Sequence, residues 1–192
     1  MNKRNLIAGG LSMAALAVFS SGCTTTSGAS GDPAAQRQAI NSQADNALAR
    51  LFREARDSEA LVKEARGVLV FPNFISAGFI VGGASGQGVL REGGKTVSYH
   101  RMTEGSVGLL AGAQSQAVFI LFMTADSLAR FKSSNGWTVG ADAGVTMLTV
   151  GADASITGRT AQQPVVGFVL TNSGLMASVS LNGSRITPLN LN

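Results

Sequence analysis

The sequence predicts an α+β domain: a curved antiparallel β-sandwich or half-open barrel of about nine to ten short strands, with N-terminal helices and one short inserted helix. Apolar residues between 34 and 66 recur at the three- and four-residue spacing of helices. From residue 67 onward, short apolar runs alternate with Gly-rich turns. The chain holds 24 glycines and only 14% charged residues, a composition typical of closely packed β-structure.

The first 22 residues have the layout of a secretory signal peptide. Lys3 and Arg4 form a short positive region, Leu6 to Phe19 carries no charge, and small residues lead into Cys23. The apolar stretch is too short and wrongly flanked for a spanning helix. This layout resembles the bacterial lipobox, in which diacylglycerol is attached to the cysteine and a fatty acid, such as palmitate, to its freed amine. We therefore expect Cys23 to be lipidated.

An alternative for this segment is an ordinary signal peptide followed by an incidental thiol. Ser20 stands where lipoboxes usually carry Leu, but Cys23 is the only cysteine and has no disulfide partner to explain it. Several acyl chains would anchor the chain stably to a membrane of the cell envelope. Thr24 follows the cysteine, where Asp would retain a lipoprotein in the inner membrane. In a Gram-negative source we expect an outer-membrane protein that faces the periplasm or the surface.

Cleavage before Cys23 would leave 170 residues, enough for one domain with a sizeable core. Residues 23–33 are expected to be the acylated cysteine and a flexible linker, and residues 34–192 the domain, with helices over 34–66 and a β-rich core over 67–192. The formal charge falls from +4 to +2 without Lys3 and Arg4. The basicity therefore comes partly from targeting, and no nucleic-acid partner is expected.

Two helices are predicted before the strands. Asp32 is placed to cap the first helix, with Pro33 in its first turn, and the pattern continues to about Asp57. Ser58 is placed to cap a second, shorter helix that continues through Arg66. The first helix carries one apolar stripe, made of Ile40, Ala44, Ala47, Leu48, Leu51, Phe52 and Ala55.

The remaining pattern predicts strands and one helical excursion at Asp126–Lys132. Repeated glycines inside the strands indicate strong curvature or tightly stacked sheets. The expected strands are Val68–Phe71, Ile75–Gly82, Gly88–Arg91, Lys95–Met102, Ser106–Ala113, Gln116–Thr124, two within Trp137–Thr157, Val165–Asn172 and Leu175–Asn182.

Residues that could support catalysis are few, so we expect no enzyme, no cofactor and no metal site. His100 is the only histidine, which excludes paired-histidine mechanisms, and we expect it on a half-exposed strand face. A Ser–His–Asp set lacks the G-x-S-x-G sequence around a candidate nucleophile. Asp142 and Asp153 could meet across a hairpin as a glycosidase-like pair. Turn or network roles for both are the favoured interpretation.

A glycine-rich segment imitates a phosphate-binding loop. Gly88 to Thr96 resembles a Walker A sequence but has five intervening residues in place of four, and it lies between strand signals rather than before a helix. We interpret Glu92–Lys95 as a hairpin turn and Gly82–Gly88 as another turn.

Seven short motifs, in order, resemble the SYLF lipid-binding family. They cover about residues 58–188. The sequence departs from the family where Val97–Arg101 replaces a "WSaP" motif and where Ser178 and Asn182 alter the closing motif. The matching segments are Glu64–Phe71, Ser76–Phe79, Ser85–Arg91, Gly105–Gln114 with the apolar run that follows, the short helix that ends in Phe131, Gly140–Gly144 and Gly174–Gly183.

The resemblance implies a non-catalytic, membrane-associated domain that binds phospholipid. Eukaryotic relatives bind phosphoinositides through a basic amphipathic N-terminal helix, and some bind actin; only general phospholipid binding is expected here. Arginine guanidinium groups match phosphate geometry, which makes Arg50, Arg53 and Arg56 candidates for contacts with anionic headgroups.

The apolar stripe of the first helix has two interpretations. Leu48, Leu51 and Phe52 would insert into the membrane, or they would pack on the β-core as in any docked helix. The alternative function is an envelope scaffold that binds another protein, of unknown identity, without lipid recognition beyond its anchor.

Overall fold

The computed structural model describes residues 32–78, 81–107, 112–148, 163–171, 174–175 and 181–191. The predicted signal peptide, the lipidation residue Cys23 and almost all of the predicted linker lie outside the described residues. Asp153 and most of the predicted strand Leu175–Asn182 also lie outside them.

The two predicted N-terminal helices are present as α1 (Pro33–Glu54) and α2 (Ser58–Glu64). Asp32 caps α1 as predicted, because its carboxylate accepts a hydrogen bond from the Ala34 amide at 3.0 Å. The first helix ends earlier than the sequence predicted, since Ala55 is already extended. Ala65 is also extended, so α2 stops before Arg66, whose amide donates to the Phe122 carbonyl.

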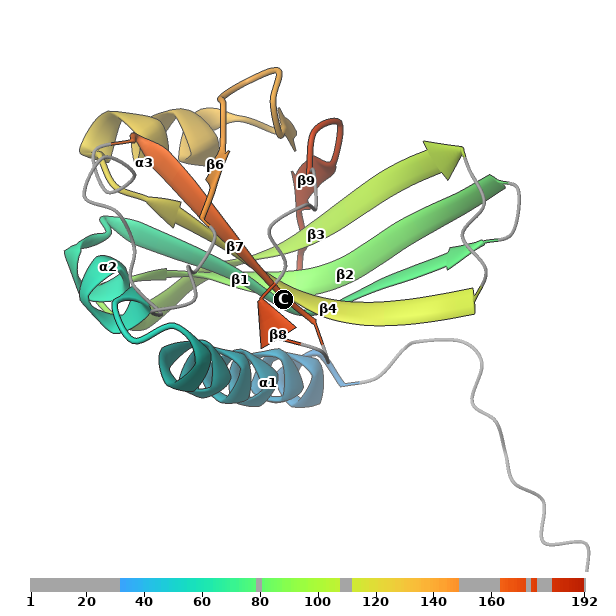
Figure 1. Cartoon of the computed structure of the whole chain (residues 1–192), viewed down its shortest axis with the longest axis horizontal. Helices are drawn as coiled ribbons and strands as arrows, with labels where there is room; N and C mark the ends of the chain where they lie inside the picture. Colours follow the sequence, from blue (N-terminus) through green and yellow to red (C-terminus); the bar gives the residue numbers. More distant parts are fainter. Residues whose placement is uncertain are drawn as a thin grey trace, which may run out of the picture. The chain divides into compact units, whose positions relative to one another are not determined.

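The chain then forms a curled, mixed sheet, which confirms the predicted α+β half-barrel. A third helix, α3 (Ala125–Ser133), is the predicted helical excursion. Among the described residues the strands follow the order β5-β9-β3-β2-β1-β4-β7-β6, with β8 paired to β7 (Figure 1). All pairings are antiparallel except β6 with β7, which run parallel. The strands are β1 (Gly67–Gly78), β2 (Val81–Glu92), β3 (Lys95–Val107), β4 (Gly112–Phe122), β5 (Trp137–Thr138), β6 (Thr146–Met147), β7 (Val165–Thr171), β8 (Gly174–Leu175) and β9 (Arg185–Pro188).

Several strand boundaries differ from the prediction. β1 continues through Pro72, because a register shift between Phe71 and Phe74 accommodates the missing amide donor. The segment Gly82–Gly88, predicted as a turn, lies inside β2. The predicted strand Ser106–Ala113 is divided between the end of β3 and the start of β4.

The region after Trp137 also departs from the prediction of two long strands. β5 and β6 have two residues each, and a turn at Ala141 and Asp142 lies between them. Residues 149–157 of the second predicted strand lie outside the described residues. Small alternating residues in this segment mimic a strand pattern, but hydrogen bonds from the amides of Ala141 and Asp142 to the Thr138 carbonyl form the turn.

The segment Gly88–Thr96, which resembles a phosphate-binding loop in sequence, contains a hairpin turn, as predicted. Gly93 and Gly94 join β2 to β3 with φ of 55° and 80°. Two consecutive residues with positive φ form the turn that matches the twist of paired strands, and glycine adopts this conformation without steric cost. No helix follows the glycines, so the loop has no helix N-terminus to hold phosphate.

Strand alternation divides the interior into two cores on opposite faces of the sheet. One core lies beneath α1 and α2 and includes Val68, Val70, Phe119 and Phe168. The other lies beneath α3 and β5 and includes Leu69, Phe71, Phe122 and Trp137 with several more apolar side chains. Neighbouring residues of β1 thus alternate between the two cores, as expected for a sheet covered on both faces.

Strand β2 passes so close to β1 that side chains there are excluded. A Cβ on Gly88 would lie 2.4 Å from the Val70 carbonyl oxygen and 2.5 Å from Cδ1 of Phe71. Gly86 has a similar contact with the Asn73 carbonyl oxygen, at 2.7 Å. These glycines therefore allow the ring of Phe71 to pack against bare backbone in the core beneath α3.

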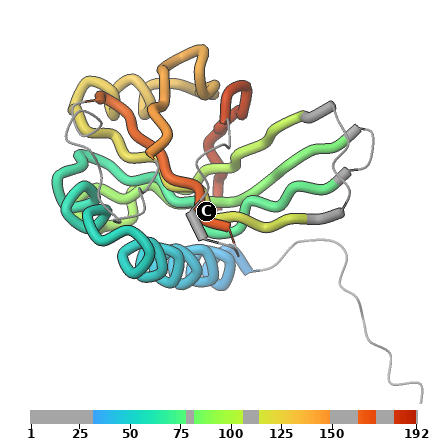
Figure 2. The backbone as a smooth tube through the Cα atoms, in the orientation of Figure 1, coloured from blue at the N-terminus to red at the C-terminus, as the bar shows by residue number. Residues whose placement is uncertain are grey.

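The outer ends of β1 to β4 extend past the helices as a four-stranded ribbon (Figure 2). One row across it is formed by Ser115, Ile75, Ser85 and Thr103, which are paired in register. All four side chains are exposed and none is charged. Ile75 has 51% of its surface exposed, which is unusual for a large apolar side chain.

The contact between Gly88 and Phe71 generates the first prediction. Gly88→Ala should lower the free energy of unfolding by about 2 to 3 kcal/mol, because the new methyl group overpacks the contact with Phe71 and the Val70 carbonyl. Gly105→Ala is the matched control, since its Cβ would meet nothing within 4 Å. Urea unfolding of both variants measures the difference, and equal stability of the two would contradict this account of Gly88.

Candidate functional site

The apolar stripe of α1 faces the sheet. Leu51 is completely buried and Leu48 is 9% exposed, and both belong to the core with Val68 and Phe168. Phe52 is partly buried and packs against the same core. These three side chains therefore pack on the β-core. Insertion of Leu48 and Leu51 into a membrane would require α1 to leave the sheet.

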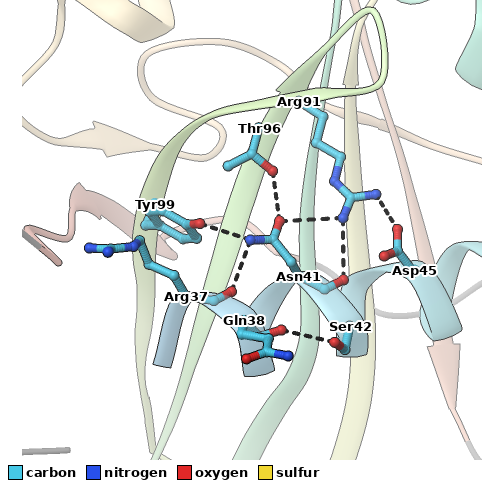
Figure 3. A network of polar contacts seen from close by, with 8 residues as sticks. All are labelled: Arg37, Gln38, Asn41, Ser42, Asp45, Arg91, Thr96 and Tyr99. Atoms are coloured by element: carbon cyan, nitrogen blue, oxygen red, sulfur yellow. Dashed lines mark hydrogen bonds and ion pairs between the residues drawn. The ribbon is translucent and has the colours of Figure 1, made fainter. Parts of the chain in front are cut away.

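A polar network holds one flank of α1 against β2 and β3, and Asn41 is its centre (Figure 3). The Asn41 side-chain amide donates to the Tyr99 hydroxyl at 2.8 Å, and its carbonyl accepts from the Thr96 hydroxyl at 2.6 Å. Arg91 donates to the Asn41 backbone carbonyl at 3.2 Å and pairs with Asp45 at 2.5 Å. These bonds fix the position of the helix along the sheet.

The three candidate arginines occupy different environments. Arg50 is half-buried on the other flank of α1, where its Nε donates to the Glu54 carboxylate at 2.8 Å and its guanidinium also donates to the Thr171 carbonyl of β7. Arg53 is exposed in the last turn of α1, and Arg56 is exposed in the turn that follows. The structure therefore positions Arg50 against the sheet and leaves the other two on the surface.

A groove of about 240 Å³ lies beside Arg50, between α1 and strands β1, β4 and β7. Four carboxamide side chains line it, and Gln43 accepts a hydrogen bond from Asn73 at 2.9 Å across its opening. Ser115 joins the groove to the uncharged row of the ribbon. The complete lining is Gln43, Asn46, Ala47, Arg50, Pro72, Asn73, Ser115, Gln116, Ala117 and Leu170.

The groove combines one fixed cation with neutral donors and acceptors. Carboxamides offer two N–H donors each, and a guanidinium offers five. Oxygen atoms of a phosphodiester accept such bonds readily, and the carboxamides add no charge that would repel them. Sequence reasoning found Arg50 but missed the four carboxamides, because they come from α1, β1 and β4 and only the sheet register brings them together.

His100 is buried, not half-exposed as predicted. Its side chain lies in the core beneath α3, where its ring centroid is 4.9 Å from that of Phe131. Nε2 is 2.8 Å from the Ser98 hydroxyl, whereas Nδ1 has no partner among the described residues. Burial lowers the pKa of His100 from 6.5 to about 4, so the ring is neutral at pH 7.

Of the two carboxylates considered for glycosidase chemistry, Asp142 lies in the part of the chain that the structure describes and Asp153 lies outside it. Asp142 is exposed in the turn after β5, where its carboxylate accepts a hydrogen bond from the Thr138 amide at 2.5 Å. Its role there is that of a turn residue, as favoured from the sequence. The described residues contain no group of three or more His, Cys, Asp and Glu that could hold a metal ion.

Residues 103–190 match the Ysc84 family model, described as "Las17-binding protein actin regulator". Over this part, the chain is similar to the Ysc84 (SYLF) family, which is consistent with a SYLF-domain protein. The match confirms the resemblance seen in the sequence motifs, and the SYLF domain is a binding domain rather than a known enzyme fold. No curated protein matches the chain. The matched segment runs from within β3 to the end of the domain and so includes β4 and β7 beside Arg50.

None of the helices in the described residues is long and apolar enough to cross a bilayer. Of these, α1 is the longest, at 22 residues, and its large apolar residues form the stripe that faces the sheet.

The burial of His100 generates a prediction of pH dependence. The folded-state pKa lies below the unfolded value, so the unfolded chain takes up the proton first. The contribution to stability is complete above pH 6.5 and is lost as the pH falls toward 4. At about 1.4 kcal/mol per pKa unit, the loss is about 3 kcal/mol.

His100→Gln keeps a hydrogen-bonding side chain at this position but removes the titration. Urea unfolding from pH 7 to pH 4 should therefore show a smaller loss of stability in this variant than in the wild type. Parallel stability curves for the two proteins over this range would contradict the assignment to His100.

Proposed function

We propose that this protein is a membrane-anchored lipoprotein of the cell envelope whose SYLF domain binds phospholipid headgroups without catalysis. The observation that carries the proposal is the groove beside Arg50, where a positioned guanidinium lies among four uncharged carboxamides. The arrangement suits a phosphate group, and two of its strands, β4 and β7, lie within the SYLF match, whereas α1 and β1 precede it.

The surroundings of the groove support contact with a membrane surface. Arg53 is exposed one helical turn from Arg50, so the two cations lie on neighbouring positions of α1. The exposed row of the ribbon begins at Ser115 in the groove and presents Ile75 between uncharged neighbours, and the charged Arg185 of β9 follows only after Thr103. A bilayer could therefore approach this side with its anionic headgroups near the arginines and its interface near the ribbon.

The proposed anchor at Cys23 would hold the domain near the membrane. Acyl chains at the thiol and the freed amine would provide the stable attachment, because each buried methylene contributes about 0.8 kcal/mol. Residues 24–31 would then give the domain enough reach to bring the groove to the headgroups of the same bilayer. In a Gram-negative source we place the anchor in the outer membrane.

The second candidate function is binding of a protein partner. The description of the matching family as a Las17-binding actin regulator favours it. The exposed row around Ile75 would be the contact surface in that case, since it is uncharged and unoccupied by other described residues of this chain. Vesicle binding separates the two functions.

The groove generates a prediction for vesicle flotation. The full chain with Cys23→Ser should float with anionic vesicles of phosphatidylglycerol and phosphatidylcholine, less with neutral ones, and less at high salt. A basic side chain near such a surface contributes about 1 kcal/mol, so Arg50→Ala should weaken binding about fivefold and the triple Arg50, Arg53 and Arg56 variant about a hundredfold.

Arg130→Ala is the matched control. Arg130 is an exposed arginine of α3, on the other side of the sheet, and it forms an ion pair with Asp126 at 2.9 Å. The Arg130→Ala variant should bind vesicles as tightly as the wild type. Equal losses of vesicle binding in Arg50→Ala and Arg130→Ala would show that overall charge alone attracts the protein. Absence of flotation with either vesicle would contradict phospholipid binding and favour the protein partner.

The anchor generates a separate prediction. In cells supplied with an alkyne analogue of palmitate, the wild-type protein should become labelled and should sediment with membranes. Cys23→Ser should remove both the label and the sedimentation with membranes, because the chain has no other cysteine. Ser20→Leu, which restores the usual lipobox residue, should retain the label. A labelled Cys23→Ser protein would exclude this residue as the acylation site.

A further inference from the structure

We propose that the cavity on the opposite flank of α1 binds a single-chain anionic amphiphile, meaning an alkyl chain of about ten carbons with one carboxylate or phosphate head. The cavity measures about 360 Å³ and lies between α1, α2, β1 and the β2–β3 turn. It is separate from the groove beside Arg50, so this inference does not depend on the proposed headgroup site.

The walls of the cavity are apolar. Leu48 comes from α1, Val62 from α2 and Val68 from β1, and Ala65 lies where α2 ends. Since liquid water occupies about 30 Å³ per molecule, the cavity has room for roughly a dozen atoms of that size. A ten-carbon chain with a carboxylate matches this volume, and its methylenes would lie against aliphatic side chains.

One wall carries an unsatisfied donor. Arg91 lines the cavity, its side chain is only 13% exposed, and its terminal nitrogens bond to Asp45 and Asn41. Its Nε is buried and has no hydrogen-bond partner among the described residues. A buried donor without an acceptor costs about 1 to 3 kcal/mol. Nε is closed to water, so an anionic oxygen would reach it after a small shift of the lining side chains and would then remove that cost.

A second cation lies at the edge of the cavity. Lys63 lines it, is largely exposed and pairs with Glu59 at 2.8 Å. No carboxylate belongs to the lining, whereas two cations do. The charges therefore favour an anion over a cation or a neutral head, and the apolar walls favour an alkyl chain over a free inorganic anion.

Isothermal titration calorimetry tests the inference on the full chain with Cys23→Ser. Decanoate and decyl phosphate should bind with one-to-one stoichiometry. Octanoate should bind about tenfold or more weakly than decanoate, because each methylene lost weakens binding about fourfold. Decanol, which lacks the anion, should also bind about tenfold or more weakly. Binding of inorganic phosphate as tight as that of decyl phosphate would overturn the role of the chain.

Two substitutions on α2 form a matched pair. Val62→Phe fills the cavity and should abolish decanoate binding, whereas Ala60→Phe adds the same ring at an exposed position of α2 and should not. Arg91→Lys keeps the charge but removes Nε–H, so it should weaken decanoate and leave decanol unchanged. A purely structural role of Arg91 would weaken both.

The outcomes separate this inference from the proposed function. The triple Arg50, Arg53 and Arg56→Ala variant should lose vesicle binding and keep decanoate binding, and Val62→Phe should do the reverse. Decanoate binding that survives in a folded Val62→Phe variant would overturn the assignment of the cavity. Absence of decanoate binding to the folded wild type would mean that the cavity holds only water.

Discussion

The docking of α1 on the sheet is the interaction on which both ligand regions depend. Its apolar stripe is inserted into the core through Ala44 and Leu51, which are completely buried, and this contact covers β1 and β2. A helix is narrower than the sheet it covers, so each of its flanks leaves a recess against the strands. The carboxamide groove is the recess toward β4, and the apolar cavity is the recess toward the β2–β3 turn.

Polar contacts decide the position of α1 on the sheet, because apolar packing alone tolerates sliding. Asn41 fixes the N-terminal half through Tyr99 and Thr96 of β3, and Arg50 fixes the C-terminal half through the Thr171 carbonyl of β7. The same residues therefore serve packing and recognition. Arg50 is held in place by Glu54 and β7, which reduces the entropy that it would lose on binding a phosphate.

The sequence predicted what depends on local pattern. The helix cap at Asp32, the stripe of α1, the Gly93–Gly94 turn and the α+β class are consequences of spacing and residue type. The predictions were wrong where contacts between distant parts of the chain determine the structure. Gly82–Gly88 resembles a turn, yet it is a strand because Gly86 and Gly88 allow β1 to approach. His100 has a polar side chain, but the aromatic ring of Phe131 in α3 that packs against it is distant in the chain.

The candidate sites show the same division. Arg50 could be selected from the sequence because a basic residue beside an apolar stripe is a local signal. The carboxamides around it could not, since Asn73 and Gln116 are ordinary strand residues until the β1–β4 register aligns them. Arg91 could not be selected from the sequence either, because its importance comes from burial beneath α1 and from an Nε–H without a partner among the described residues. Where a helix crosses several strands, the residues that meet at its flanks are therefore set by sheet register.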